Sequence, residues 1–113
     1  MTATNETRKN AESAVVGSLI IHALLRDYDE ATTAMKQIDE VRYEFQNQLF
    51  QRAYSGISGL MRDGSDIDLI RISSEICATQ DEFIELATAM RETPSAKNIS
   101  RYVDVMLGLR GAA

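Results

Sequence analysis

The chain has 113 residues, of which 44% are hydrophobic and 26% are charged, and its net charge is −5. This length fits one domain, and the composition is typical of folded globular proteins rather than disordered chains. The negative charge opposes binding to a phosphate backbone, so we expect no nucleic-acid partner.

The composition also bears on the compartment. A single cysteine, Cys77, excludes an internal disulfide and favours a reducing cytoplasm. The most apolar run, residues 14–25, is shorter than the roughly 20 residues that cross a bilayer. Acidic residues follow this run where a signal peptide would need a small-residue cleavage site. We therefore expect a cytoplasmic protein with no membrane partner.

Helices are expected over almost the whole chain. One proline and few alternating β-branched runs favour an all-α fold, a single compact domain of about five helices. Residues 1–10 are polar and predict a flexible N-terminal tail, with one helical domain over residues 11–113. The first helix, residues 11–26, is apolar on most sides, so His22 inside it is expected to be a structural residue.

The longest apolar pattern lies in residues 31–61, where apolar residues recur every three or four positions. This spacing predicts a long central helix, joined to the first helix by a short connection as an α-hairpin. The helix is apolar over more than one face, so either the domain uses all these residues internally or a second polypeptide covers some of them. The residues predicted to face a partner are Tyr43, Phe50, Tyr54, Ile57 and Met61.

Shorter helices follow the central one. The small residues of segment 55–59 predict either a kink or a close approach of another helix, and Gly64 is expected to end the central helix. A third helix is expected over residues 66–78. Thr79 and Glu82 form a T-x-x-E capping box for a fourth helix that runs to Glu92. A last helix follows Pro94 and is expected to end at Gly108 or Gly111.

No pattern in the sequence predicts catalysis. Asp63, Asp66 and Asp68 lack the glycine and glutamate that a calcium-binding loop requires. Cys77 has no histidine nearby to stabilise a thiolate and is expected to be a buried packing residue. The phosphate-binding and zinc motifs are also missing. We therefore predict a non-enzymatic protein with no metal and no cofactor.

The pair of helices over residues 72–90 has the spacing of a helix-turn-helix, but Asp81, Glu82 and Glu85 lie where a reading helix meets DNA. The excess of apolar residues instead predicts a protein partner, with a homodimer formed through the central helix.

A short, acidic, all-helical chain of this kind resembles small bacterial antiactivators, a resemblance of size, charge and class that assigns no functional residue. It implies a regulator that sequesters a partner protein and blocks the dimerisation or DNA binding of a quorum-sensing type of transcription regulator. The alternative is a helical assembly factor or chaperone, from a phage or a secretion system, that masks an apolar surface of a structural subunit.

Overall fold

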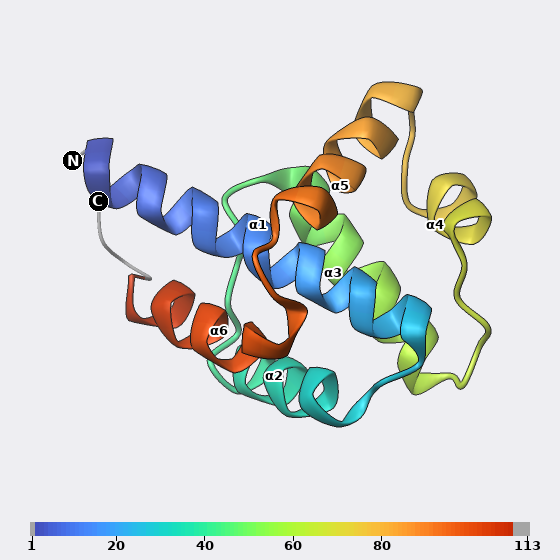
Figure 1. The fold of residues 1–113 in the computed structure, drawn as a ribbon, viewed down its shortest axis with the longest axis horizontal. Coiled ribbons are helices and arrows are strands. Elements are labelled where there is room, and N and C mark those ends of the chain that lie inside the picture. Colours follow the sequence, from blue (N-terminus) through green and yellow to red (C-terminus); the bar gives the residue numbers. More distant parts are fainter. Residues whose placement is uncertain (1, 110–113) are drawn as a thin grey trace.

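The computed structural model describes residues 2–109, which form six α-helices, one short 3₁₀ helix and no strand (Figure 1). The all-α prediction is confirmed, with one helix more than expected. In chain order the elements are α1 (Thr2–Leu25), α2 (Asp29–Glu40), α3 (Gln48–Arg62), α4 (Leu69–Glu75), α5 (Gln80–Glu92), η1 (Ala96–Asn98) and α6 (Ile99–Gly108).

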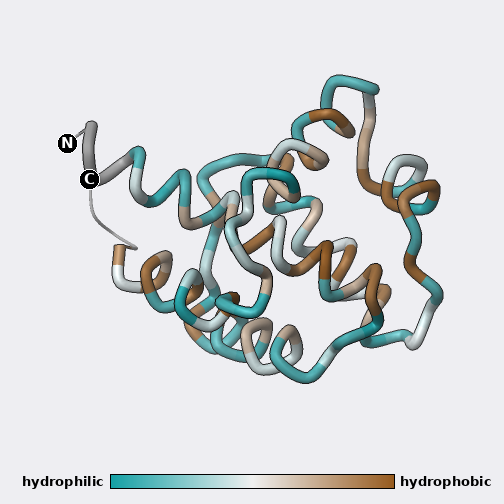
Figure 2. The backbone as a smooth tube through the Cα atoms, in the orientation of Figure 1, coloured by the Kyte–Doolittle hydropathy of each residue, from teal (hydrophilic) through white to brown (hydrophobic). Residues whose placement is uncertain are grey.

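Helix α1 is the element around which the others pack. It crosses the middle of the fold and contacts α3, α5, α6 and η1, with α5 above it and α6 below it in the view of Figure 1. Its C-terminal half is apolar, as Figure 2 shows, and Val15, Val16, Leu19 and Ile20 are fully buried there. The central helix is therefore α1, and α2 packs mainly against α6 instead of forming a hairpin with α1.

The N-terminal segment is ordered as helix. Residues 2–10, predicted to be a flexible tail, form the first turns of α1. One reason is that the Arg8 Nε donates a hydrogen bond of 2.9 Å to the Tyr43 hydroxyl, which ties the start of α1 to a distant loop. Met1 and residues 110–113, which include Gly111, lie outside the described residues.

The predicted helix over residues 31–61 is wrong, because residues 41–47 interrupt it. Arg42 takes a left-handed conformation with φ of 52°, and the Tyr43 N–H bonds the Ile38 carbonyl at 3.2 Å, which closes the end of α2. The next residues alternate between interior and surface, with Tyr43 and Phe45 buried and Glu44 exposed between them. The segment is therefore an inward-facing connection.

A buried carboxylate holds this connection against α1. Glu12 is buried, and its Oε2 accepts the Tyr43 hydroxyl at 2.5 Å and the Gln46 N–H at 2.9 Å. Arg8 Nε lies 3.8 Å from the same oxygen. A buried charge is tolerated only where hydrogen-bond donors and a counter-charge surround it. Here the two donors lie in residues 43–46, and the counter-charge, Arg8, lies on α1.

The shorter elements follow their expected signals with shifted boundaries. Gly64, with φ of 69°, ends α3 as predicted, and the Ser65 N–H bonds the Leu60 carbonyl at 3.0 Å. Helix α4 is shorter than the predicted span of 66–78, since Asp68 is its N-cap. The Thr79 hydroxyl accepts the Glu82 N–H at 3.2 Å, which confirms the predicted start of the fourth helix, α5.

His22 joins the C-terminal end of α1 to η1. Its side chain is buried, with Nδ1 2.9 Å from the Asp27 carbonyl and Nε2 2.8 Å from the Ala96 carbonyl. A neutral ring donates to one of these oxygens, and a protonated ring donates to both. The prediction that His22 is a structural residue agrees with this position.

Glycines permit a close approach between elements at two places. A Cβ at Gly17 would lie 2.2 Å from the Thr93 Oγ1 and 2.5 Å from the Ala89 carbonyl oxygen, so α1 and α5 touch at their backbones. A Cβ at Gly56 would lie 2.9 Å from the Ile76 side chain. The second observation favours the close approach that segment 55–59 predicted.

Gly17→Ala should reduce the free energy of unfolding by about 2 kcal/mol or more, because a methyl group there overlaps a backbone carbonyl that has no room to move. The matched control is Gly59→Ala, in a helical position where an added Cβ meets nothing within 4 Å. That variant should be neutral or more stable by up to about 1 kcal/mol. Urea denaturation checks both, and equal stability of the two variants would contradict the close crossing.

Candidate interaction surface

The five residues predicted to face a partner lie in the interior of the chain. Tyr43, Phe50, Tyr54, Ile57 and Met61 are between 0% and 8% exposed. The break at residues 41–47 turns α3 against α1, so the second apolar face of segment 31–61 is covered by the domain itself. The expectation that these side chains lie on an open surface is wrong for this fold, and their contact with a partner stays a prediction.

The two tyrosines of this set hold the connection and α2 in place. The Tyr54 hydroxyl lies 2.7 Å from the Asp39 Oδ1 and 3.1 Å from the Met35 carbonyl oxygen, both on α2. Burial raises the pKa of Tyr54, and its hydrogen bond to Asp39 adds to this. Burial, followed by the hydrogen bond to Glu12, raises the pKa of Tyr43 to about 12. Both hydroxyls therefore act as structural donors.

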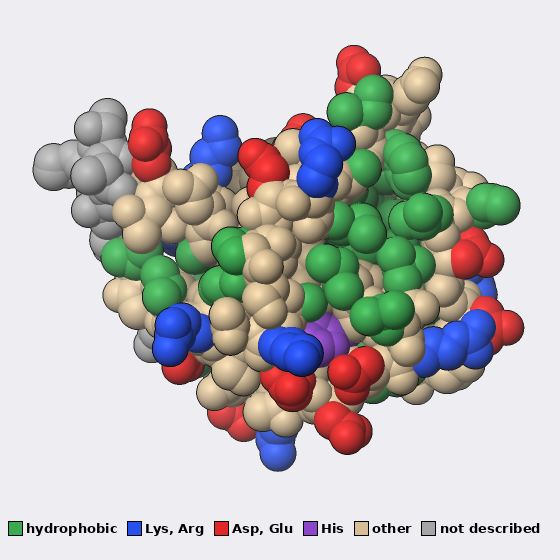
Figure 3. Space-filling view, viewed as in Figure 1, with side chains coloured by type: hydrophobic (Ala, Val, Ile, Leu, Met, Phe, Trp, Pro, Cys, Tyr) green, Lys and Arg blue, Asp and Glu red, His purple; other side chains and the backbone are tan. Residues whose placement is uncertain are grey.

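The apolar side chains that remain exposed lie on a different face. Figure 3 shows hydrophobic side chains gathered over the end of α1, α4 and α5, and we call the large exposed apolar residues of these three elements the apolar face. Its members are Leu25 at 73% exposed, Leu69 at 45%, Ile70 at 81% and Ile84 at 53%. The helical spacing of Leu25, Leu69 and Ile70 predicted that they belong to the apolar stripes of their helices, whereas the structure leaves them exposed.

Two contacts show that the parts of the apolar face adjoin one another. Arg26, next to Leu25, pairs with Asp66 at 3.2 Å, which brings the end of α1 beside the start of α4. A hollow of about 460 Å³ between α4 and α5 is lined by Ser73, Cys77 and Phe83, among others. The three elements that carry the apolar face, which are separate in the sequence, therefore lie beside one another.

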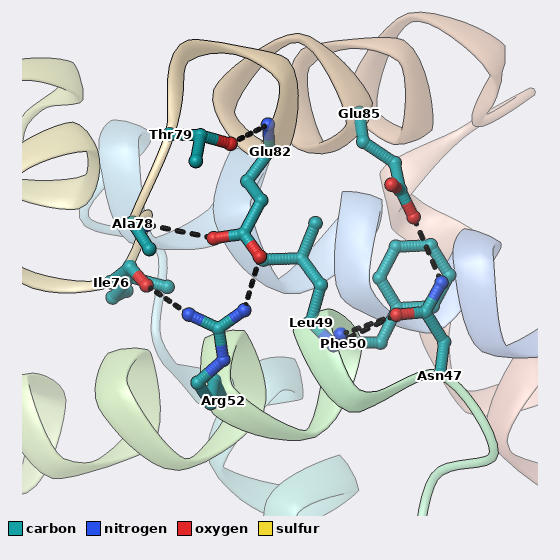
Figure 4. A network of polar contacts seen from close by, with 9 residues as sticks. All are labelled: Asn47, Leu49, Phe50, Arg52, Ile76, Ala78, Thr79, Glu82 and Glu85. Carbon is teal, nitrogen blue, oxygen red and sulfur yellow. Dashed lines mark hydrogen bonds and ion pairs between the residues drawn. The ribbon is translucent and has the colours of Figure 1, made fainter.

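A polar network fixes α4 and α5 to α3 (Figure 4). The Arg52 guanidinium on α3 donates to the Ile76 carbonyl at 3.0 Å and to the Glu82 carboxylate at 2.5 Å. Glu82 also accepts the Ala78 N–H at 2.7 Å. The hydrogen bond from Arg52 is the main reason that the pKa of Glu82 is lowered. One arginine thus holds both the end of α4 and the start of α5.

Asn47 supplies a second link in the same network. Its side-chain oxygen accepts the N–H groups of Leu49 and Phe50 at 2.8 and 3.2 Å, which caps α3, and its nitrogen donates to Glu85 at 2.8 Å (Figure 4). This cap is also the sequence signal for the break in segment 31–61, since asparagine favours the first position before a helix.

The remaining candidate groups serve structure. Cys77 is half-buried against the core rather than fully buried, and burial raises the pKa of its thiol. Within residues 2–109 no group of three or more histidine, cysteine or acidic side chains is arranged to hold a metal ion. No helix in this part of the chain is long and apolar enough to span a bilayer.

A comparison with protein families shows to which family the chain belongs. The family model described as the DnaB-like helicase N-terminal domain matches residues 4–107, which is nearly the whole chain. The chain belongs to this family. Domains of the family are helical and mediate oligomerisation and protein interactions, in agreement with the predicted protein partner. No curated protein and no solved structure matches the chain at a significant level.

This family membership corrects the function predicted from the sequence. The resemblance to antiactivators of transcription regulators is wrong, because the matching family is that of a helicase domain. The alternative, an assembly factor or chaperone from a phage or secretion system, is not supported either. Size, charge and helical class are shared by many unrelated small domains, so they do not separate these families.

The free energy of unfolding should fall as the pH rises from about 10 to 12. Unfolded tyrosines ionise near 10, whereas Tyr43 in the folded chain keeps its proton to about 12, so its contribution is complete below 10 and is lost toward 12. Chemical denaturation at a series of pH values measures the slope. Tyr43→Phe should reduce the slope, and Tyr28→Phe, which leaves the Tyr43 hydroxyl in place, should keep it. An unchanged slope in Tyr43→Phe would refute this assignment.

Asn47→Ala should lower the stability by about 1 kcal/mol, because two N–H groups at the start of α3 lose their acceptor. Asn98→Ala is the matched control, since Asn98 precedes α6 and makes no side-chain cap hydrogen bond. Thermal unfolding followed by circular dichroism compares the two. Equal melting temperatures for both variants would count against the role of Asn47.

Proposed function

We propose that this chain is a non-catalytic assembly domain of a DnaB-like replicative helicase and works in DNA replication. In this proposal it self-associates, with a homodimer as the basic unit, and it presents a surface on which other proteins dock. The single observation that carries the proposal is the family match over residues 4–107.

The positions of the ionisable side chains support a role without catalysis. The one histidine is enclosed between two backbone carbonyls. Glu12 accepts hydrogen bonds from Tyr43 and Gln46 and lies 3.8 Å from the Arg8 guanidinium. Burial disfavours the thiolate of Cys77, which is the nucleophilic form. These groups are engaged in holding the fold, so none is free for acid–base or nucleophilic chemistry.

Charge supports an indirect relation to DNA. With a net charge of −5, the domain repels a phosphate backbone at long range, so we propose that it contacts helicase subunits and other proteins and leaves DNA to the rest of the machinery. The site of action is the cytoplasm, as the single cysteine also predicted.

Light scattering and native mass spectrometry test the proposal. The purified chain should have a mass above that of one chain at high concentration, and it should enter complexes with the replicative helicase of its own genome. It should hydrolyse no ATP by itself. An unrelated acidic helical protein of similar size serves as the control. A chain that stays monomeric at all concentrations and never associates with the helicase would refute the proposal, as would ATP hydrolysis by the purified chain.

A further inference from the structure

The side chains of the apolar face are far more exposed than core residues are. Ile70 is 81% exposed and Ile84 is 53% exposed, while their helical neighbours Ile72 and Leu86 are buried and hold α4 and α5 on the domain. Contiguous exposed apolar residues are typical of protein interaction sites. Removing such side chains from water favours binding, so these residues provide a useful binding surface.

The surroundings of the apolar face are acidic. The segment over residues 63–92, which contains α4 and α5, holds eight acidic residues and two arginines. Three of the acids are paired, namely Asp66 with Arg26, Glu75 with Arg71 and Glu82 with Arg52. Among the described residues no cation lies within ion-pair distance of the other acids of this segment, which are Asp63, Asp68, Asp81, Glu85 and Glu92.

The position of these unpaired charges is favourable for a docked helix. Asp68 immediately precedes Leu69, and Asp81 lies one turn before Ile84 on the same side of α5. Apolar side chains are thus bordered by carboxylates at both α4 and α5. A partner that matches this pattern has apolar residues on one side of a helix and lysine or arginine along the edges of that side.

We propose that the apolar face binds a basic amphipathic helix of a protein partner. This deepens the proposed function and rests on it, because it assigns the docking surface of the assembly domain and the chemistry of what docks there. The acidic border makes a second copy of the chain a poorer occupant, since two such borders would face each other with like charge. The same border repels anionic lipid and nucleic acid.

A labelled synthetic peptide tests the proposal directly. The probe is an amphipathic helix of about 18 residues, or five turns, with leucine on one side and lysine on the other. One control peptide has the same composition in scrambled order, and a second has glutamate in place of lysine. Fluorescence anisotropy with the full chain should detect binding of the first peptide only, and added salt should weaken it.

Two variants locate the binding site. Ile70→Gln combined with Ile84→Gln should weaken binding of the lysine peptide at least about tenfold, because each replaces buried apolar surface in the complex. The matched control is Val105→Gln, which removes a residue of 42% exposure on α6, beside the N-terminal half of α1, and should bind as the unaltered chain does. Circular dichroism confirms that all variants fold, since the changed side chains are exposed.

The outcomes separate this inference from the proposed function. Equal binding of the scrambled or glutamate peptide, or no binding of the lysine peptide, overturns the inference, while light scattering still reports whether the chain self-associates. If the double variant loses self-association instead, the apolar face is the contact between two copies, and the inference is overturned in favour of that role. Loss of peptide binding with unchanged self-association supports it.

Discussion

The enclosure of α1 is the constraint on which the rest of the structure depends. A helix with apolar residues on nearly every side requires neighbours on every side, and α3, α5, α6 and η1 provide them. Glu12 adds a polar fixed point in this apolar setting, because its carboxylate holds the connection between α2 and α3. Where α3 lies, and hence where α4 and α5 attach, follows from these contacts.

The sequence predicted the helical class and several helix ends. Thr79 and Gly64 act at their expected positions because their effects are local: one side chain accepts a nearby N–H, and one backbone adopts a positive φ. The prediction of one long helix over residues 31–61 was wrong. Apolar residues keep a helical spacing through the break by coincidence, and Arg42, rather than a glycine, takes the left-handed turn. The alternation of Tyr43, Glu44 and Phe45 and the Asn47 cap were the available signals.

The candidate surface was harder to predict than the fold. Phe50 and Tyr54 have the chemistry of interface residues, yet they are buried because α3 faces α1, a pairing that depends on contacts distant in the sequence. Ile70 keeps the spacing of a core residue in an amphipathic helix, yet α4 buries Ile72 and leaves Ile70 exposed. Ile84 is two positions before the buried Leu86 and lies on the outer side of α5. Periodicity identifies which residues share a face of one helix, but the neighbours of that face come from tertiary structure. Family membership likewise came from comparison rather than from charge and class.

The close crossing at Gly17 reaches beyond the core. A Cβ at Gly17 would lie 2.5 Å from the Ala89 carbonyl oxygen of α5, and the same two helices carry Leu25 and Ile84 of the apolar face. The spacing between these two parts of the apolar face is thereby tied to the smallest residue in the interior. A larger side chain at this buried position would move α1 and α5 apart, and Leu25 and Ile84 with them, although neither residue had changed.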